Sequence, residues 1–339
     1  YMVRNEVQLN SKYYDFSPYF ADKKLESLIF TSTRPAGGGS NLDPITGEGF
    51  SDIYSTERDP KGKWSSPKPL SEIVNTGDNE GAAVFDDKYG ELYYTKCGYD
   101  DKKAFGCQIY KTRKQGQDFA EPELLDFGID DTTVAAHPVF IDDDFILYVS
   151  DMRGGQGGKD LWYIKYEKKT KIWGPPVNLG PEFNTAGDEM FPYIRENGDL
   201  YFASNGRVGM GGLDIFHCKM LGEDVEELKW SKPENLKAPI NSSANDFGII
   251  YEDEKDRGFF SSDRAGGKGK DDIYSFMLPP LIFMLKGTVT SYNEDGGDGS
   301  PLGNVKVKLL GTDGSVTEVM TDGTGAYEFE MKDNDERYI

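Results

Sequence analysis

The sequence has little of the chemistry on which many enzymes depend. It contains only two histidines, His137 and His217, and three cysteines among 339 residues. No cluster of cysteines or carboxylates accompanies either histidine, so a zinc site is not expected. The Gly-x-Ser-x-Gly motif of serine hydrolases is also missing. We therefore expect no catalytic, metal-binding or cofactor-binding residues, with a bound cation as a weak alternative.

Positive charge and long apolar runs are scarce as well. There are 38 Lys and Arg against 59 Asp and Glu, a net charge of −21 that repels phosphate backbones and anionic bilayers. The longest apolar candidate, Leu278 to Leu285, is interrupted by two prolines and falls short of the roughly 18 residues that span a bilayer. We expect no nucleic-acid partner and no membrane span. Because the chain starts at Tyr1 and stops soon after a recognisable motif, we expect it to be a fragment.

What the sequence has in abundance is turn formers and aromatics. Forty Gly and 17 Pro accompany 20 Tyr and 20 Phe. Glycine and proline serve tight turns, while aromatic side chains pack on pleated surfaces. This composition favours an all-β protein of many short strands.

Three short elements recur along the chain. A triplet of Asp or Gln, an aliphatic residue and an aromatic residue begins at residues 52, 108, 160, 214 and 272. Between the triplets stands an aromatic residue with Pro three and Leu six positions later, at Trp64/Pro67/Leu70, Phe119/Pro122/Leu125, Trp173/Pro176/Leu179 and Trp230/Pro233/Leu236. The third element is Asn followed five residues later by an acid, at Asn10/Asp15, Asn75/Glu80, Asn184/Glu189 and Asn241/Asp246.

These elements predict four strands in each repeat. Apolar runs at 16–20, 82–85, 135–140, 190–194 and 247–251 follow the acids and predict strand A. A second run predicts strand B, the triplet is strand C, and the aromatic-Pro-Leu element belongs to the outer strand D. Four short strands per repeat of about 54 residues are typical of a propeller blade. We predict a five-bladed β-propeller over residues 1–278, with residues 1–9 supplying the outer strand that the last repeat lacks.

The hairpins between strands B and C carry a known signature. It occurs as Ser150-Asp151-Met152-Arg153 with Asp160-Leu161-Trp162, and as Ser262-Asp263-Arg264 with Asp272-Ile273-Tyr274. Looser copies are Asn205 to Arg207 with Asp214, and Thr33-Arg34 with Asp52. The repeats over residues 5–277 thus resemble the TolB-type, WD-repeat-like propellers. The resemblance implies the fold and says little of the function.

Residues 279–339 follow another pattern. Apolar side chains alternate at Val305, Val307 and Leu309 and again at Tyr327 and Phe329, as in half-buried strands. The segment resembles the carboxypeptidase regulatory-like domain, a small seven-stranded β-sandwich without catalytic residues. We expect an incomplete sandwich here.

The order of the two domains resembles the PorE-type, OmpA-family proteins of type IX secretion in Bacteroidetes. That resemblance implies a non-catalytic periplasmic scaffold, associated with the outer membrane in the full-length protein, that binds proteins of the secretion and envelope machinery. Peptidoglycan would be bound only through a domain absent here. Two alternatives stay open: a propeller that binds a glycan or peptide in its central channel, and a glycoside hydrolase with paired carboxylates there.

The B–C hairpins supply the first candidate site residues. Each pairs an arginine with the triplet aspartate, and we predict that the pairs are latches that stiffen the hairpins. A ring of ligand-binding groups is the alternative. The pairs are Arg34/Asp52, Arg153/Asp160, Arg207/Asp214 and Arg264/Asp272.

The second hairpin lacks both latch residues and has Cys97 and Cys107 at its two ends. We predict a disulfide between them, which would imply an oxidising compartment. Two buried free thiols are the alternative, and Cys218 is expected to be a packed thiol.

Two further features have competing interpretations. The acids Asp15, Glu80, Glu189 and Asp246 either cap the D–A turns or form a cation rim, and capping explains their spacing without an ion. An insertion at residues 36–50 lengthens the first B–C loop. We predict that it contacts a partner through Asn41, Asp43, Pro44, Ile45 and Phe50.

Overall fold

In the computed structural model of the chain, the described residues are 1–35, 49–98, 106–222, 227–252, 255–279, 283–292, 298–312 and 314–331. They form two compact units, Tyr1–Leu278 and Pro279–Ile339. The all-β class is confirmed, since these residues form strands and turns and contain no α-helix. No helix of the described chain is long and apolar enough to cross a membrane.

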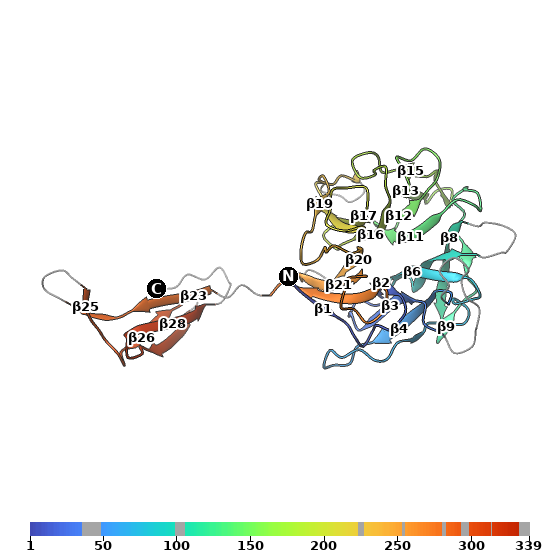
Figure 1. Cartoon of the computed structure of the whole chain (residues 1–339). Coiled ribbons are helices and arrows are strands. Elements are labelled where there is room, and N and C mark those ends of the chain that lie inside the picture. The colour runs from blue at the N-terminus through green and yellow to red at the C-terminus, as the bar shows by residue number, and fades with distance from the viewer. Residues whose placement is uncertain are drawn as a thin grey trace. The chain divides into compact units, whose positions relative to one another are not determined.

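The first unit is a five-bladed β-propeller, as the repeats predict (Figure 1). Each blade is one antiparallel sheet, and the innermost strands β2, β6, β11, β16 and β20 surround the centre. Blades 1 and 2 consist of β2 (Asp15–Phe20), β3 (Ser27–Ser32), β4 (Asp52–Glu57) and β5 (Lys68–Pro69), and of β6 (Asn79–Asp86), β7 (Glu91–Cys97), β8 (Cys107–Gln115), β9 (Asp118–Phe119) and β10 (Glu123–Leu124). Blade 3 consists of β11 (Ala135–Phe140), β12 (Phe145–Ser150), β13 (Asp160–Glu167), β14 (Ile172–Trp173) and β15 (Val177–Asn178). Blades 4 and 5 consist of β16 (Glu189–Ile194), β17 (Leu200–Ser204), β18 (Asp214–Cys218) and β19 (Glu234–Asn235), and of β20 (Asp246–Tyr251), β21 (Arg257–Ser262) and β22 (Asp272–Met277) with β1 (Met2–Asn5).

The N-terminal strand closes the ring, which confirms the prediction for residues 1–9. Strand β1 pairs antiparallel with β22, from Met2 opposite Met277 to Asn5 opposite Tyr274. The last blade therefore receives its outer strand from the beginning of the chain. Apolar side chains of neighbouring sheets fill the space between blades, for example Ile53 of blade 1 against Leu92 and Tyr94 of blade 2.

The conserved spacing of the Asn element has a direct structural cause. In blade 1 the Asn75 side chain accepts a hydrogen bond from Ile53 N at 2.8 Å and donates one to Ile53 O at 2.9 Å. The amide thus pairs with strand C as a neighbouring backbone would. The same two bonds join Asn10 to Ile273, Asn184 to Leu161 and Asn241 to Ile215.

The acid five residues later completes the turn. Glu189 accepts hydrogen bonds from the Thr185 backbone and hydroxyl and from Ser204, and Asp246 is bound in the same way by Ser242 and Ser262. These acids are buried turn caps, which is the interpretation that the spacing favours. In the described part of the chain no group of three or more His, Cys, Asp or Glu side chains could hold a metal ion.

The structure corrects the predicted latch pairs. Arg34 pairs with Asp15 instead of Asp52, and Arg264 pairs with Asp246 at 2.6 Å instead of Asp272. The turn-capping acid is the nearer partner because it begins strand A and is paired in register with the serine that ends strand B. That serine lies two residues before the arginine. Each guanidinium also lies over two stacked aromatic rings, Arg264 at 4.9 Å from Phe260 and 5.1 Å from Tyr274.

The triplet aspartates instead hold the glycine-rich loops. Asp272 accepts backbone hydrogen bonds from Lys268 and Gly269, while Asp160 and Asp214 bind the backbones of Gln156 and Met210. Asp52 has no such loop contact among the described residues. In blade 4, Arg207 donates to the carbonyls of Glu182 and Phe183 and does not pair with Asp214. Arg153 and Asp160, which were also predicted to pair, form no ion pair with each other in the described part of the chain.

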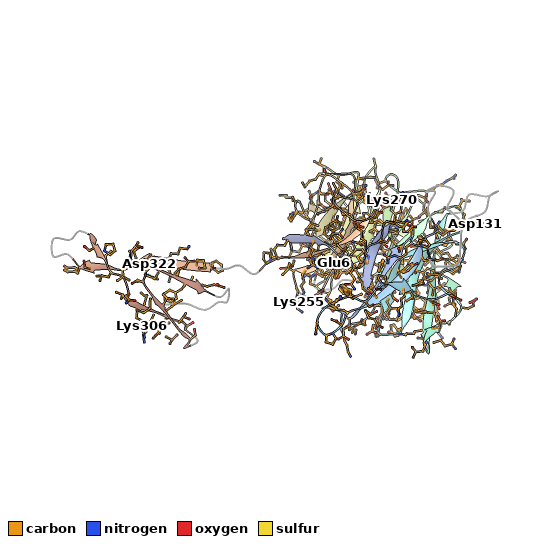
Figure 2. The ribbon with its side chains drawn as sticks, turned by 60° about the horizontal axis from the view of Figure 1, so that its bottom comes forward. Glu6, Asp131, Lys255, Lys270, Lys306 and Asp322 are labelled. Atoms are coloured by element: carbon orange, nitrogen blue, oxygen red, sulfur yellow. A yellow bond between two sulfur atoms is a disulfide. The ribbon has the colours of Figure 1, made fainter. Side chains whose placement is uncertain are left out.

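The described residues of the second unit form three two-stranded sheets, and the predicted sandwich is not confirmed. Among its described residues, Leu309 and Phe329 are the buried apolar side chains, so their core is small. Lys306 and Asp322 of this unit are labelled in Figure 2. The sheets pair β23 (Phe283–Thr288) with β28 (Ala326–Met331), β24 (Thr290–Tyr292) with β25 (Asp298–Pro301), and β26 (Lys306–Leu310) with β27 (Val316–Met320).

Cys97 and Cys107 are joined by a disulfide across the B–C hairpin of blade 2. Closing a loop of this length stabilises a fold by about 2–3 kcal/mol. We expect a reductant to lower the free energy of unfolding by that amount in urea titrations. The double variant Cys97→Ala/Cys107→Ala should be insensitive to the reductant, and an equal response in both proteins would contradict the assignment.

The Asn clamps make a second prediction about stability. Replacing Asn241 by Ala leaves the N–H of the buried Ile215 without its partner, while the C=O keeps the hydrogen bond from Leu236 N. An unmet buried group costs about 1–3 kcal/mol, so Asn241→Ala should lower the free energy of unfolding by about that amount. Gln117→Ala, at an exposed amide, is the control and should change it little. Equal effects in urea titrations would show that the clamp does not stabilise the blade.

Candidate functional site

The two ends of the propeller differ in what they present. Register places the A–B and C–D turns of every blade at one end and the B–C loops and D–A turns at the other. In Figure 2, Lys255 of the A–B turn in blade 5 and Lys270 of its B–C loop lie on opposite sides. The predicted latches and turn caps all belong to the B–C end.

The channel along the axis is almost closed. Its walls are the five inner strands, each of which has one residue with positive φ, at Ser17, Ala82, His137, Phe191 and Gly248. The cavity there measures about 30 Å³, close to the volume of a single water. A glycan or peptide therefore does not fit in the channel, and such a ligand would have to bind at one of its ends.

His137 is part of this closed wall and is not placed for acid–base chemistry. Its ring stacks on Phe191 with the ring centres 3.9 Å apart, and its Nδ1 accepts a hydrogen bond from Phe191 N. Burial lowers the pKa of His137 to about 3. The neutral ring is thus the acceptor that fixes the backbone of the neighbouring blade.

A pocket of about 530 Å³ opens at the A–B end and shares Tyr19, Tyr193 and Ile250 with the channel wall. This volume lies in the range of small-molecule sites. Aromatic side chains, which include Phe140 and Tyr251, form much of its lining. Ionisable side chains come mainly from the A–B turns, namely Asp22, Lys23, Asp86, Asp87, Lys88, Asp142, Asp143, Arg195 and Glu196.

Most of these charged groups already have structural partners. Asp22, Asp86 and Asp142 accept backbone hydrogen bonds within their own A–B turns. Asp143 forms an ion pair with Lys88 at 2.5 Å, and that ammonium group lowers the pKa of Asp143.

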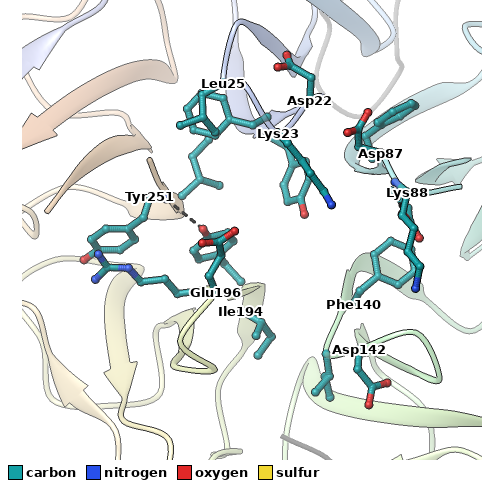
Figure 3. Close-up of a pocket in the computed structure, with 18 of the residues that line it drawn as sticks. Asp22, Lys23, Leu25, Asp87, Lys88, Phe140, Asp142, Ile194, Glu196 and Tyr251 are labelled. Carbon is teal, nitrogen blue, oxygen red and sulfur yellow. Dashed lines mark hydrogen bonds between the residues drawn. The ribbon is translucent and has the colours of Figure 1, made fainter. Parts of the chain in front are cut away.

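Three charged groups of the pocket have no partner among the described residues: Asp87, Glu196 and Lys23. They belong to blades 2, 4 and 1, respectively. Figure 3 shows Asp87 and Glu196 on opposite sides of the pocket, with the Lys23 amine directed into it. The pocket thus offers two free carboxylates and one free ammonium to a ligand.

An aromatic wall stands beside Glu196. Arg195 lies over the Tyr251 ring at 4.3 Å, and the Tyr193 hydroxyl accepts a hydrogen bond from Tyr251 N. Burial raises the pKa of Tyr193 and Tyr251 and brings that of Tyr19 to about 12. These phenols therefore remain neutral and provide apolar faces with polar edges.

Carboxyl groups with raised pKa lie at the other end. Burial raises the pKa of Asp52 to about 6 and also raises that of Glu80. Burial, together with Asp263, Asp272 and Asp15, raises the pKa of Asp271 to about 7. None of these groups lines the pocket at the A–B end.

The predicted partner-contacting loop cannot be judged here. Asn41, Asp43, Pro44 and Ile45 lie outside the described residues, and Phe50 is half-buried. Sequence analysis missed Asp87 and Glu196. The available signal was the acid that follows strand A in several repeats, to which the prediction from the sequence gave no role.

Comparison with known proteins gives no relative by sequence. No family model matches the chain, and no curated protein matches it. The TolB-type, carboxypeptidase regulatory-like and PorE-type resemblances therefore have no support beyond the propeller itself.

Solved structures match the fold at low identity. An exo-β-1,3-galactanase from Clostridium thermocellum matches with a TM-score of 0.50 and 14% identity, over 99% of this chain and 82% of that one. An α-L-arabinofuranosidase from Lactobacillus brevis gives 0.46 and 13%, over 85% and 93%. A puromycin-hydrolysing peptidase from Mycobacterium tuberculosis gives 0.41 and 13%, and the matched 74% of this chain spans only 35% of that protein.

One of these matches bears on two predictions from the sequence. A non-catalytic scaffold without enzymatic activity was expected, whereas the matched propeller with a TM-score of 0.50 is a galactanase. At 14% identity this match shows the propeller fold alone.

His137 provides a pH test of the closed channel. Its pKa is lower in the folded chain than the roughly 6.5 of an unfolded histidine, so the folded state binds fewer protons below that pH. The stability that His137 contributes is complete above about pH 6.5. It is lost as the pH falls towards 3, by up to about 1.4 kcal/mol per unit.

Since Asp52 and Asp271 oppose this trend, the measurement is the difference between the wild type and His137→Asn, in which Asn retains an acceptor. In urea titrations we expect the wild type to lose stability relative to the variant as the pH falls from 7 to 4.5. Parallel curves would contradict the buried, neutral ring.

Proposed function

We propose that the propeller is a glycoside hydrolase whose active site is the pocket at the A–B end, with Asp87 and Glu196 as its carboxylate pair. One observation carries the proposal: these two pocket carboxylates have no structural partner in the part of the chain that the structure describes, and they lie on opposite sides of the space (Figure 3). The other pocket acids are held by backbone or by Lys88.

Two free carboxylates suit the chemistry of glycosidic bond cleavage. One carboxylic acid donates a proton to the leaving oxygen, and the other carboxylate activates water or attacks the sugar. Lys23 is directed into the same pocket and favours the ionised form of a carboxylate near it (Figure 3).

The lining fits a sugar as well. Tyr19, Phe140 and Tyr193 offer apolar ring faces, against which the C–H face of a pyranose can pack, while the turn acids accept hydrogen bonds from its hydroxyls. Six carboxylates against three cationic side chains favour a neutral or cationic ligand over a polyanion. Solved structures of this fold include a galactanase and an arabinofuranosidase, which guides the choice of test substrates.

A second candidate function is carbohydrate binding without hydrolysis. It is favoured by the position of Asp52 and Asp271, since the described carboxyl groups whose raised pKa would suit a proton donor lie at the opposite end.

The test is hydrolysis of neutral oligosaccharides, including β-1,3-galacto- and arabino-oligosaccharides, measured as the release of reducing ends. We expect Asp87→Asn and Glu196→Gln each to lower the rate by about 10²- to 10⁴-fold while binding persists. Glu72→Gln, at an exposed acid outside the pocket, is the matched control and should retain the wild-type rate.

Full activity in both pocket variants would exclude this carboxylate pair. Binding by the wild type without any hydrolysis would support the second candidate instead.

The periplasmic location remains a prediction. The Cys97–Cys107 disulfide supports an oxidising compartment, since such bonds are rare in the reducing cytosol. The association with the outer membrane and with envelope partners also remains a prediction from domain order.

A further inference from the structure

Blade 3 departs from the latch that other blades use at the B–C end. In blades 1 and 5 the backbone N of Arg34 and of Arg264 donates to the serine that ends strand B, and each guanidinium binds the turn-capping acid. In blade 3 Met152 N makes the equivalent bond to Ser150, so Met152 occupies the place of the arginine. Ala135, which pairs with Ser150, occupies the place of the acid.

The exchange removes an ion pair and displaces the arginine by one residue. Arg153 is exposed, and no hydrogen bond or ion pair engages its guanidinium among the described residues. Asp151, two residues earlier, accepts a hydrogen bond from Val134 N through Oδ1. Its Oδ2 has no hydrogen-bond partner among the described residues. One B–C turn therefore presents a free guanidinium close to a carboxylate with a free oxygen.

These groups line a cavity of about 650 Å³ between that turn and the preceding D–A segment. The apolar side chains of Ile129 and Met152 lie in its wall together with Asp130. Both oxygens of Asp130 accept hydrogen bonds from Thr132 and Thr133, which lowers the pKa of Asp130 to about 2. Asp130 is thus a fixed negative charge whose two oxygens both accept hydrogen bonds within its own loop.

We infer that this cavity binds a small zwitterion, a free α-amino acid or the termini of a short peptide. Arg153 would hold the carboxylate in the two-bond geometry that guanidinium favours. Asp151 would hold the ammonium group, and the negative charge of Asp130 in the same cavity wall would add to the attraction. A simple anion would be repelled by the two aspartates, and a simple cation by Arg153, whereas a zwitterion matches both charges. Ile129 and Met152 favour an apolar side chain.

The site lies at the opposite end of the propeller from the proposed active site, so each can be tested without the other. The probe is leucyl-leucine, titrated calorimetrically into the whole chain. We expect Arg153→Met and Asp151→Asn each to raise its dissociation constant at least about tenfold, as loss of a charge-assisted contact does. The control Arg113→Met removes an exposed arginine from blade 2 and should leave binding unchanged.

Changes to the ligand test the same inference without altering the protein. N-acetyl-leucyl-leucine lacks the ammonium group and leucyl-leucinamide lacks the carboxylate, and both should bind at least about tenfold more weakly than the dipeptide. Free leucine that binds as tightly as the dipeptide would identify an amino-acid site, and weaker binding would identify a peptide site; either supports the inference. Equal binding by the blocked dipeptides, or no dipeptide binding at millimolar concentration, would overturn it.

Discussion

The hydrogen bonds of one asparagine side chain hold four of the five D–A turns, and the propeller depends on them. The asparagine pairs with strand C of the blade that the chain is leaving, as Asn75 does with Ile53. Five residues later, the N–H of the capping acid donates to the residue before the same triplet, as Glu80 does to Ser51 at 2.8 Å. Both ends of the turn are thereby fixed to one strand, which sets the position of the next blade.

The same turn closes the ring where the chain does not continue. Asn10 pairs with Ile273, and Asp15 N donates to Asp271 O at 2.8 Å, across more than 250 residues of sequence. The D–A turns fix the blades at the B–C end, while the A–B turns at the other end are joined by side-chain pairs such as Lys88 with Asp143 and line a pocket. Blade 3 follows the D–A turn that lacks the asparagine and the acid, and there Met152 stands in the place of the latch arginine and a second cavity opens.

The fold could be predicted because its signals are local and repeated. The triplet, the Asn-to-acid spacing and the aromatic-Pro-Leu element each act within one blade, and their order gave the strands and the closure by residues 1–9. The predicted partners of the arginines were wrong because Asp15 and Asp52 are both plausible neighbours of Arg34 in sequence. Only the strand register shows which of the two aspartates binds the arginine.

The candidate active site could not be predicted from the same signals. Asp87 and Glu196 stand in different blades, and no spacing relates them until five sheets surround one axis. Whether an acid in an A–B turn can bind a ligand also depends on whether backbone N–H groups of that turn already bind its carboxylate. Asp86 is bound by the backbone while the adjacent Asp87 is not.

The most direct test of the account is a crystal structure of the Glu196→Gln variant soaked with neutral oligosaccharides. The account predicts sugar density in the A–B pocket, with a glycosidic oxygen between residue 196 and Asp87 and a ring against Tyr193. Sugar bound at the B–C end near Asp52 or Asp271, with the A–B pocket empty, would contradict it.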